Sequence, residues 1–152
     1  MRTILVTGGT VFVSKYVAEY YAKKGEKVYV LNRNTRLQPE NTMLIEGDRH
    51  SLGDKLKEYK FDTVIDVTAY NEADISTLCD ALGEFEDYIM ISSSAVYPET
   101  NVQPFTEEQT MGENIFWGKY GTDKNFADLW TFCWKRNLRK IYLIWEMKSV
   151  SA

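Results

Sequence analysis

Short apolar segments alternate with longer amphipathic segments along this chain, and that alternation limits the possible folds more than any other feature. The short segments show no period-two pattern, which is typical of parallel strands covered on both faces. The sequence predicts strands over Arg2–Thr7, Lys27–Leu31, Thr42–Glu46, Thr63–Val67, Tyr88–Ser92 and Lys140–Trp145. It predicts helices over Val11–Lys24, Leu52–Tyr59, about Glu72–Leu82 and about Phe116–Trp134. We therefore expect an α/β fold, a doubly wound, Rossmann-like and mostly parallel sheet of about six strands with helices on both faces.

Length and charge narrow the class of protein further. The 152 residues are enough for one domain, 1–152, and a net charge of −4 gives no reason to expect nucleic acid or an anionic membrane as partner. The longest apolar runs are far too short to span a bilayer. Two cysteines cannot build a disulfide framework or a metal cluster, and they suit a reducing compartment. We expect a cytoplasmic protein without a metal.

A glycine-rich turn joins the first predicted strand to the first predicted helix, where a dinucleotide loop belongs. Glycine lets the backbone turn tightly and approach a pyrophosphate, whose charge the helix N-terminus favours. The candidate cofactor-binding residues of this loop are Thr7, Gly8, Gly9, Thr10, Val11, Phe12 and Val13. The pattern Thr-Gly-x-x-Gly-x-x-Gly keeps only its first glycine here. Its other two glycine positions hold Val11, which is branched, and Ser14, which is small enough to keep helix and strand close. The alternative is an ordinary glycine-rich turn.

The end of the second strand carries no carboxylate to bind the ribose hydroxyls of NAD. The sequence there is Leu31-Asn32-Arg33-Asn34. Arg33 is suited to pair with a 2′-phosphate or to lie over the adenine, which favours NADP slightly over NAD. The alternative is a solvated surface arginine.

A serine-rich strand end and a Tyr-x-x-x-Lys pair form the second candidate site. Tyr120 and Lys124 are four residues apart, so their polar groups share one helical face. The pKa of a free tyrosine is about 10, and a neighbouring ammonium lowers it toward the range of a useful base. A serine hydroxyl from the end of the adjacent strand can hold the substrate oxygen whose proton the tyrosine exchanges.

Together these motifs resemble the extended short-chain dehydrogenase/reductases, the NAD-dependent epimerase/dehydratase family. The resemblance covers Arg2 to about Lys124 and extends to a sugar-nucleotide-epimerase-like subgroup. It implies that Ser93 is the catalytic serine, with Ser94 as the alternative, that Tyr120 is the acid/base, and that Lys124 binds the nicotinamide ribose. It also implies cofactor contacts by Asn32, Arg33, Asp48, Arg49, Thr68, Ala69 and Tyr70, with Asp48 near the adenine.

The chain departs from that family after Lys124. No Arg-Pro segment follows, and the sequence ends at Ala152, so most of the substrate lobe is not in this sequence. Three functions therefore stay open. The chain is an enzyme that transfers a hydride between NAD(P) and a sugar nucleotide or similar hydroxyl or keto substrate, a dinucleotide-binding module, or a truncated and inactive relative.

The last predicted helix carries more apolar residues than one face buries against its own sheet. In the family this sequence resembles, two helices from each subunit commonly form a four-helix bundle. We therefore expect a homodimer through the helices near 72–82 and 116–134. The alternative is that the extra aromatic residues pack beneath the sixth strand and the chain end.

Overall fold

Six parallel strands form a single sheet in the order β3-β2-β1-β4-β5-β6. The computed structural model describes residues 1–100, 106, 108–134 and 138–141. The strands are β1 (Thr3–Thr7), β2 (Lys27–Asn32), β3 (Thr42–Glu46), β4 (Leu56–Asp66), β5 (Leu82–Ile91) and β6 (Leu138–Ile141). The predicted parallel, six-stranded sheet is confirmed.

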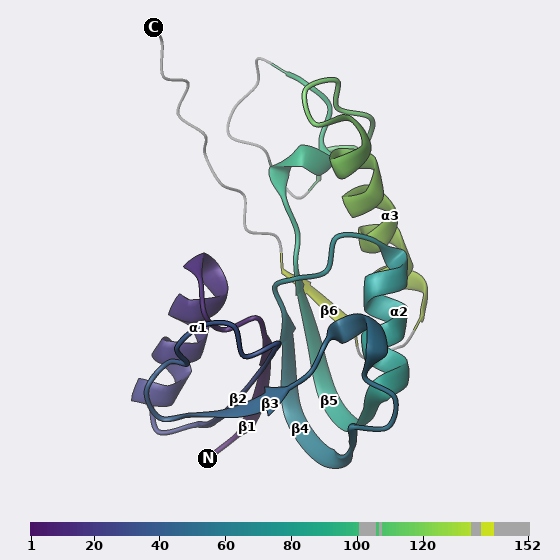
Figure 1. Cartoon of the computed structure of the whole chain (residues 1–152). Helices are drawn as coiled ribbons and strands as arrows, with labels where there is room; N and C mark the ends of the chain where they lie inside the picture. The colour runs from purple at the N-terminus through teal and green to yellow at the C-terminus, as the bar shows by residue number, and fades with distance from the viewer. Residues whose placement is uncertain (101–105, 107, 135–137, 142–152) are drawn as a thin grey trace, which may run out of the picture.

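Three helices cover the sheet. They are α1 (Phe12–Lys23), α2 (Glu72–Ala81) and α3 (Gly118–Trp134), and two single turns of 3₁₀ helix are η1 (Arg49–Ser51) and η2 (Ser94–Val96). Figure 1 shows α1 on one face of the sheet and α2 with α3 on the other. The doubly wound architecture is therefore confirmed. In the described part of the chain, no helix is long and apolar enough to cross a membrane.

Alternate residues of the strands feed two separate hydrophobic layers, because successive side chains of a strand point to opposite faces. On the α1 face, Ile4 and Val6 pack with Ala18 of the helix. On the other face, Leu5 packs in a cluster that includes Leu78 of α2. Both faces of β1 are thus buried, which explains why its sequence is apolar without alternation.

The strand order reverses between β1 and β4. From β1 the chain builds outward to β2 and β3, and from β4 it builds the other way to β5 and β6. Crossover connections therefore leave in opposite directions beyond the carboxyl ends of β1 and β4. Ligands of doubly wound proteins bind at such a switch point. Thr7 and Asp66, the last residues of these strands, lie at its base.

The prediction of a helix over Leu52–Tyr59 is wrong. Leu56–Tyr59 are the first residues of β4, which is 11 residues long and pairs with a β5 that begins at Leu82. Tyr59 and Phe61 stack with an interplanar angle of 3°, and Tyr29 of β2 meets both rings edge-on. Packing between aromatic side chains of β2 and β4, which lie on either side of β1, thus outweighs the helical spacing of the sequence.

The sixth strand begins earlier than predicted. We predicted Lys140–Trp145, whereas β6 spans Leu138–Ile141 and pairs in parallel with β5. Residues 142–145 lie outside the described residues. The side chains from Leu129 to Trp134, on which the predicted surplus of apolar surface largely rests, also lie outside the description.

Candidate functional site

The loop between β1 and α1 depends on two glycines in the left-handed region. Gly8 and Gly9 have φ angles of +83° and +80°. A Cβ on Gly9 would lie 2.5 Å from Cγ1 of Val30, so the loop rests directly on β2. Helix α1 then begins without a side-chain cap, because its N-cap residue is Val11. An anionic ligand is favoured at this helix start by the helix dipole.

Two cavities meet above this loop. The larger has a volume of about 840 Å³ and the smaller about 400 Å³. Val11, Thr68 and Tyr70 line both, so the two spaces adjoin at these side chains. A ligand with two bulky ends joined by a pyrophosphate suits this shape, with the link crossing beside the loop and the helix N-terminus.

The three candidate catalytic residues come together around the larger cavity. Ser93 follows β5, Tyr120 and Lys124 lie on consecutive turns of α3, and all three line the cavity. The ring of Tyr120 lies 6.1 Å from the ring of Tyr70 and 6.0 Å from that of Trp117, measured between centroids. Ser93 Oγ accepts a hydrogen bond from Ala95 N as the cap of η2. The runner-up, Ser94, lines the same cavity.

Lys124 is a buried cation that joins two strand ends. Its residue is only 3% exposed, and its Nζ donates to the carbonyl oxygen of Ala69 and, at 2.9 Å, to that of Ile91. The same Nζ lies 5.6 Å from the ring centroid of Tyr70. Lys124 thus fixes the loop after β4 against the end of β5, and its charge lies against the cavity that Tyr120 lines.

The smaller cavity holds the residues predicted at the adenosine end. Asn32, Arg33 and Asp48 all line it. Asn32 Nδ2 donates to the Gly8 carbonyl at 2.7 Å, so the end of β2 is tied to the phosphate loop. Thr35 and Arg36 also line this cavity and were missed by the sequence reading. Their only signal in the sequence is that they follow Arg33 closely.

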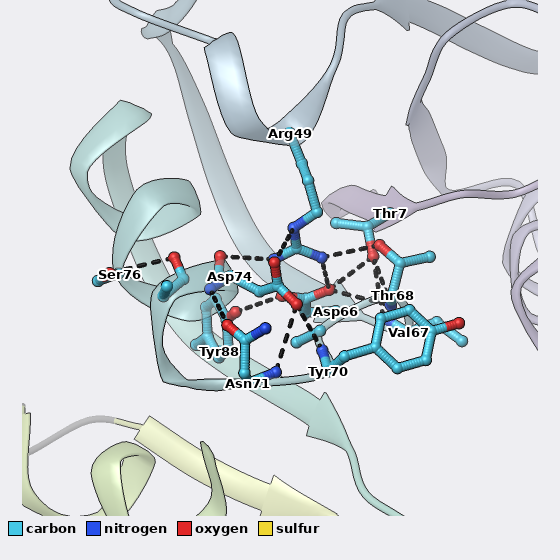
Figure 2. Close-up of polar contacts among 12 residues, drawn as sticks. Thr7, Arg49, Asp66, Val67, Thr68, Tyr70, Asn71, Asp74, Ser76 and Tyr88 are labelled. Carbon is cyan, nitrogen blue, oxygen red and sulfur yellow. Dashed lines mark hydrogen bonds and ion pairs between the residues drawn. The ribbon is translucent and has the colours of Figure 1, made fainter. Parts of the chain in front are cut away.

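Arg49 is held by protein groups as well as lining the smaller cavity. Its guanidinium donates to both carboxylate oxygens of Asp66, at 3.0 and 2.9 Å, and to Thr68 Oγ1 at 2.8 Å. A further bond runs from Nη2 to the carbonyl of Asp74 at 2.6 Å. Figure 2 shows the guanidinium at the centre of these contacts. Arg49 was predicted as a cofactor contact, and its charge is balanced by a buried carboxylate instead of standing free for a phosphate.

Asp66 connects this arginine to the phosphate loop and to the core. It is fully buried, and it accepts hydrogen bonds from Thr7 Oγ1 at 2.7 Å and from Tyr88 Oη at 2.6 Å. Thr7 Oγ1 in turn accepts from the backbone N–H of Val67 at 2.9 Å. The sequence reading assigned no role to Asp66 or Tyr88, because nothing in their spacing shows that the topology brings them together.

The pKa values in this cluster follow from burial and pairing. Burial acts to raise the pKa of Asp66, but the charge of Arg49 and the hydrogen bonds to the carboxylate hold it below the usual value. Burial acts to lower the pKa of Arg49, and the charge of Asp66 reverses that effect. Burial, followed by the charge of Asp66, raises the pKa of the Tyr88 phenol well above 10.0. Arg49 and Asp66 are therefore both charged, and Tyr88 is neutral.

The remaining predicted residues have different surroundings. Thr10 lines the smaller cavity, and Phe12 and Val13 line the larger one. Gly9 packs against β2, and Ala69 is buried with its carbonyl bound to Lys124. The cofactor contacts proposed for all the site residues stay predictions. Among the described residues, no cluster of three His, Cys, Asp or Glu side chains is placed to hold a metal ion.

Solved structures with this fold include sugar-nucleotide enzymes. A UDP-glucose 4-epimerase superposes with a TM-score of 0.77 at 17% identity, covering 93% of this chain and 50% of the other. The Bordetella bronchiseptica enzyme WbmG, solved with NAD, superposes with a TM-score of 0.70 at 13% identity, covering 91% and 52%. At these identities the likeness shows the fold alone. This chain spans about half the length of both structures.

Sequence comparisons match part of this chain to known proteins. The Arabidopsis thaliana chloroplast stem-loop binding protein of 41 kDa b is 25% identical over 128 residues, which cover 72% of this chain and 34% of that protein. Residues 4–78 match the NAD dependent epimerase/dehydratase family, and they contain the phosphate loop, Arg49, Asp66 and the loop that lines both cavities. The family's printed name specifies NAD, and nothing in these comparisons supports the expected preference for NADP. The match to the NAD dependent epimerase/dehydratase family thus extends over residues 4–78, just under half of the chain.

Proposed function

We propose that this protein binds NAD across its two cavities and oxidises or reduces a carbinol carbon of a sugar nucleotide or a similar hydroxyl or keto substrate. The observation that carries the proposal is the meeting of the cavities at Val11, Thr68 and Tyr70, with Ser93, Tyr120 and Lys124 around the larger one. The smaller cavity takes the adenosine end and the larger takes the nicotinamide and the reacting part of the substrate.

The residues present fit a dinucleotide. Gly8 and Gly9 keep the loop backbone free of side chains, and the dipole at the start of α1 favours the charge of the pyrophosphate. Arg33 and Arg36 bring positive charge to the adenosine cavity. When bound, NAD supplies the site that accepts the hydride from the carbinol carbon and returns it in the reverse direction.

The proton belongs to the protein's own residues. We assign Tyr120 as the acid/base. Its phenolate takes the hydroxyl proton in the oxidation, and its phenol gives the proton back in the reverse step. Ser93 holds the reacting oxygen by a hydrogen bond. Lys124, which is buried and lines the same cavity, is placed beside the reacting groups.

The relative's printed name refers to stem-loop binding, and we do not carry that partner over. A net charge of −4 opposes binding to a phosphate backbone, whose affinity for proteins comes largely from Lys and Arg contacts. A cytoplasmic location stays a prediction.

A second candidate function is a dinucleotide-binding module without turnover. It rests on the phosphate loop and the two cavities, which account for dinucleotide binding without any substrate contact. Without a substrate held in near-attack geometry, a bound cofactor and a base do not give catalysis.

Calorimetric titration with NAD and NADP, followed by a turnover assay with UDP-sugars, separates these functions. The enzyme proposal expects NAD binding and turnover that Tyr120→Phe abolishes while NAD binding persists. NAD binding without turnover supports the module. No binding of either dinucleotide up to millimolar concentration would overturn both.

A further inference from the structure

The side chain of Thr68 carries a hydroxyl and a methyl group, and the two contact different parts of the site. Its Oγ1 accepts a hydrogen bond from Arg49 Nη1 at 2.8 Å. Its Cγ2 lies 3.1 Å from the position that a Cβ on Gly8 would occupy, so the methyl group packs over the phosphate loop. A β-branched side chain has stiff χ1 preferences, so fixing the hydroxyl also fixes the methyl. Arg49 thereby determines which face Thr68 turns to the junction of the two cavities.

The backbone of this segment is tied to the same centre. Thr68 N donates to Asp66 Oδ1 at 3.1 Å, and Tyr70 N donates to Asp74 Oδ2 at 2.7 Å. Arg49 reaches both acidic residues, through its bonds to Asp66 and to the Asp74 carbonyl. Asp74 also closes the capping box at the start of α2 with Asn71. Figure 2 shows these groups converging on the segment that lines both cavities.

Arg49 is well suited to this task, because a guanidinium offers several donors in a fixed planar arrangement. It serves Asp66, Thr68 and the Asp74 carbonyl at once. A lysine has a single ammonium at the end of a flexible stem and does not reproduce a bidentate contact. The side chain of Arg49 is 11% exposed and that of Asp66 is 0% exposed, so water does not replace these bonds readily.

We propose that Arg49 is a positioning residue for the dinucleotide, acting through Thr68 and not by a bond to a phosphate of the cofactor. The inference rests on the proposed function, since it requires that NAD crosses between the cavities beside Thr68. It gives the Gly47-Asp48-Arg49 segment two separate tasks. Asp48 faces the adenosine cavity, and Arg49 fixes the wall that the cofactor passes on its way to the larger cavity.

A double-mutant cycle on NAD affinity tests the coupling. The variants are Arg49→Lys, Thr68→Val, which keeps the branched shape but removes the hydroxyl, and the two combined. Each single change should raise the Kd for NAD about tenfold, and the combination should also raise it about tenfold, because both remove one interaction. Thr68→Val leaves the Arg49–Asp66 pair in place and carries the test if Arg49→Lys does not fold. In that case, a Kd for NAD of the Thr68→Val variant within about twofold of that of the unsubstituted chain overturns the proposal.

Tyr88→Phe is the matched control, because it removes a hydrogen bond to Asp66 from the core side of the network. It should lower the melting temperature and leave the Kd for NAD within about twofold, since Tyr88 lines neither cavity. Additive effects near a hundredfold in the combined variant would overturn the proposal, and so would a Tyr88→Phe that binds NAD as weakly as Arg49→Lys. If the unsubstituted chain does not bind NAD, the proposed function fails as well.

Discussion

Gly9 offers the sharpest test of why the phosphate loop lies where it does. Its φ of +80° is in the left-handed region, and a Cβ would lie 2.5 Å from Cγ1 and 2.8 Å from Cβ of Val30. Carbon atoms at rest are about 3.5–4.0 Å apart, so an alanine cannot be accommodated without a shift of the loop or of β2. Gly9→Ala therefore combines backbone strain with a steric clash.

The two costs are of similar size. A left-handed conformation costs an alanine about 1–2 kcal/mol, and an extra methyl in a packed region costs about 1–3 kcal/mol. We expect Gly9→Ala to lower the free energy of unfolding by about 2–5 kcal/mol, a large part of the about 5–15 kcal/mol that stabilises a typical domain. Moving the loop away from β2 should also weaken NAD binding, because the backbone then no longer approaches the pyrophosphate at the same place.

Gly25 separates the two costs. Its φ is +81°, nearly that of Gly9, but nothing lies within 4 Å of the position of a Cβ. Gly25→Ala should therefore lose only the strain, about 1–2 kcal/mol. Urea denaturation of both variants gives the comparison. In a chain that already carries Val30→Ala, Gly9→Ala should lose less stability than in the unsubstituted chain. A Gly9→Ala variant that loses no more stability than Gly25→Ala would refute the reasoning.

Three further predictions concern the buried charges and the helices. The pKa of Tyr88 is raised in the folded state, so its contribution to stability is complete below pH 10 and is lost as the pH rises. The free energy of unfolding measured above pH 10 should therefore depend less on pH in Tyr88→Phe than in the unsubstituted chain. Lys124→Met should lower the free energy of unfolding by about 1–3 kcal/mol and abolish turnover, because the carbonyls of Ala69 and Ile91 lose their donor; a stable, active variant in these assays would contradict this. If the predicted homodimer forms through α2 and α3, Phe126→Glu should convert it to a monomer in sedimentation experiments. Tyr20→Glu on α1 is the control and should leave the dimer intact. A monomeric unsubstituted chain would exclude the dimer.

The parts of the fold that sequence predicts are those whose cause is local. The Gly8-Gly9 pair is required by backbone angles within the loop itself, and the apolar residues Ile4 to Val6 reflect a strand covered on both faces. The capping box at the start of α2 likewise needs only Asn71 and Asp74, which are three residues apart. Each of these patterns can be recognised without knowing what lies beside it in space.

The start of β4 fails that condition. Leu52, Leu56 and Tyr59 have the i, i+4, i+7 spacing of a helix, and sequence alone favours one. What decides the conformation is distant in the chain, since Leu56 pairs with Leu82 in the sheet and Tyr59 packs against Tyr29. A strand whose pairing partners lie 24 or more positions away gives no signal in a local window.

The candidate site divides in the same way. Tyr120 and Lys124 could be paired from their spacing on one helix, and the structure brings them to the cavity that also holds Ser93. The hydrogen-bonded cluster around Arg49 could not be predicted from the sequence, because its members come from four separate elements: Thr7, Arg49, Asp66 and Tyr88. The sheet order, which places β4 between β1 and β5, brings Thr7, Asp66 and Tyr88 together, and Arg49 reaches them from η1.

The departures of the phosphate loop from the glycine pattern are smaller in the structure than in the sequence. Val11 has φ −140° and ψ 148°, an extended conformation that any residue adopts, so its backbone does not require glycine. Ser14 fills the third position as a small buried residue, and its Oγ donates to the Val11 carbonyl at 2.7 Å. What a glycine at 11 would change is the side chain at the junction of the cavities. Substitution there alters the space beside the pyrophosphate and leaves the path of the loop intact, so the missing glycines are weak evidence against cofactor binding.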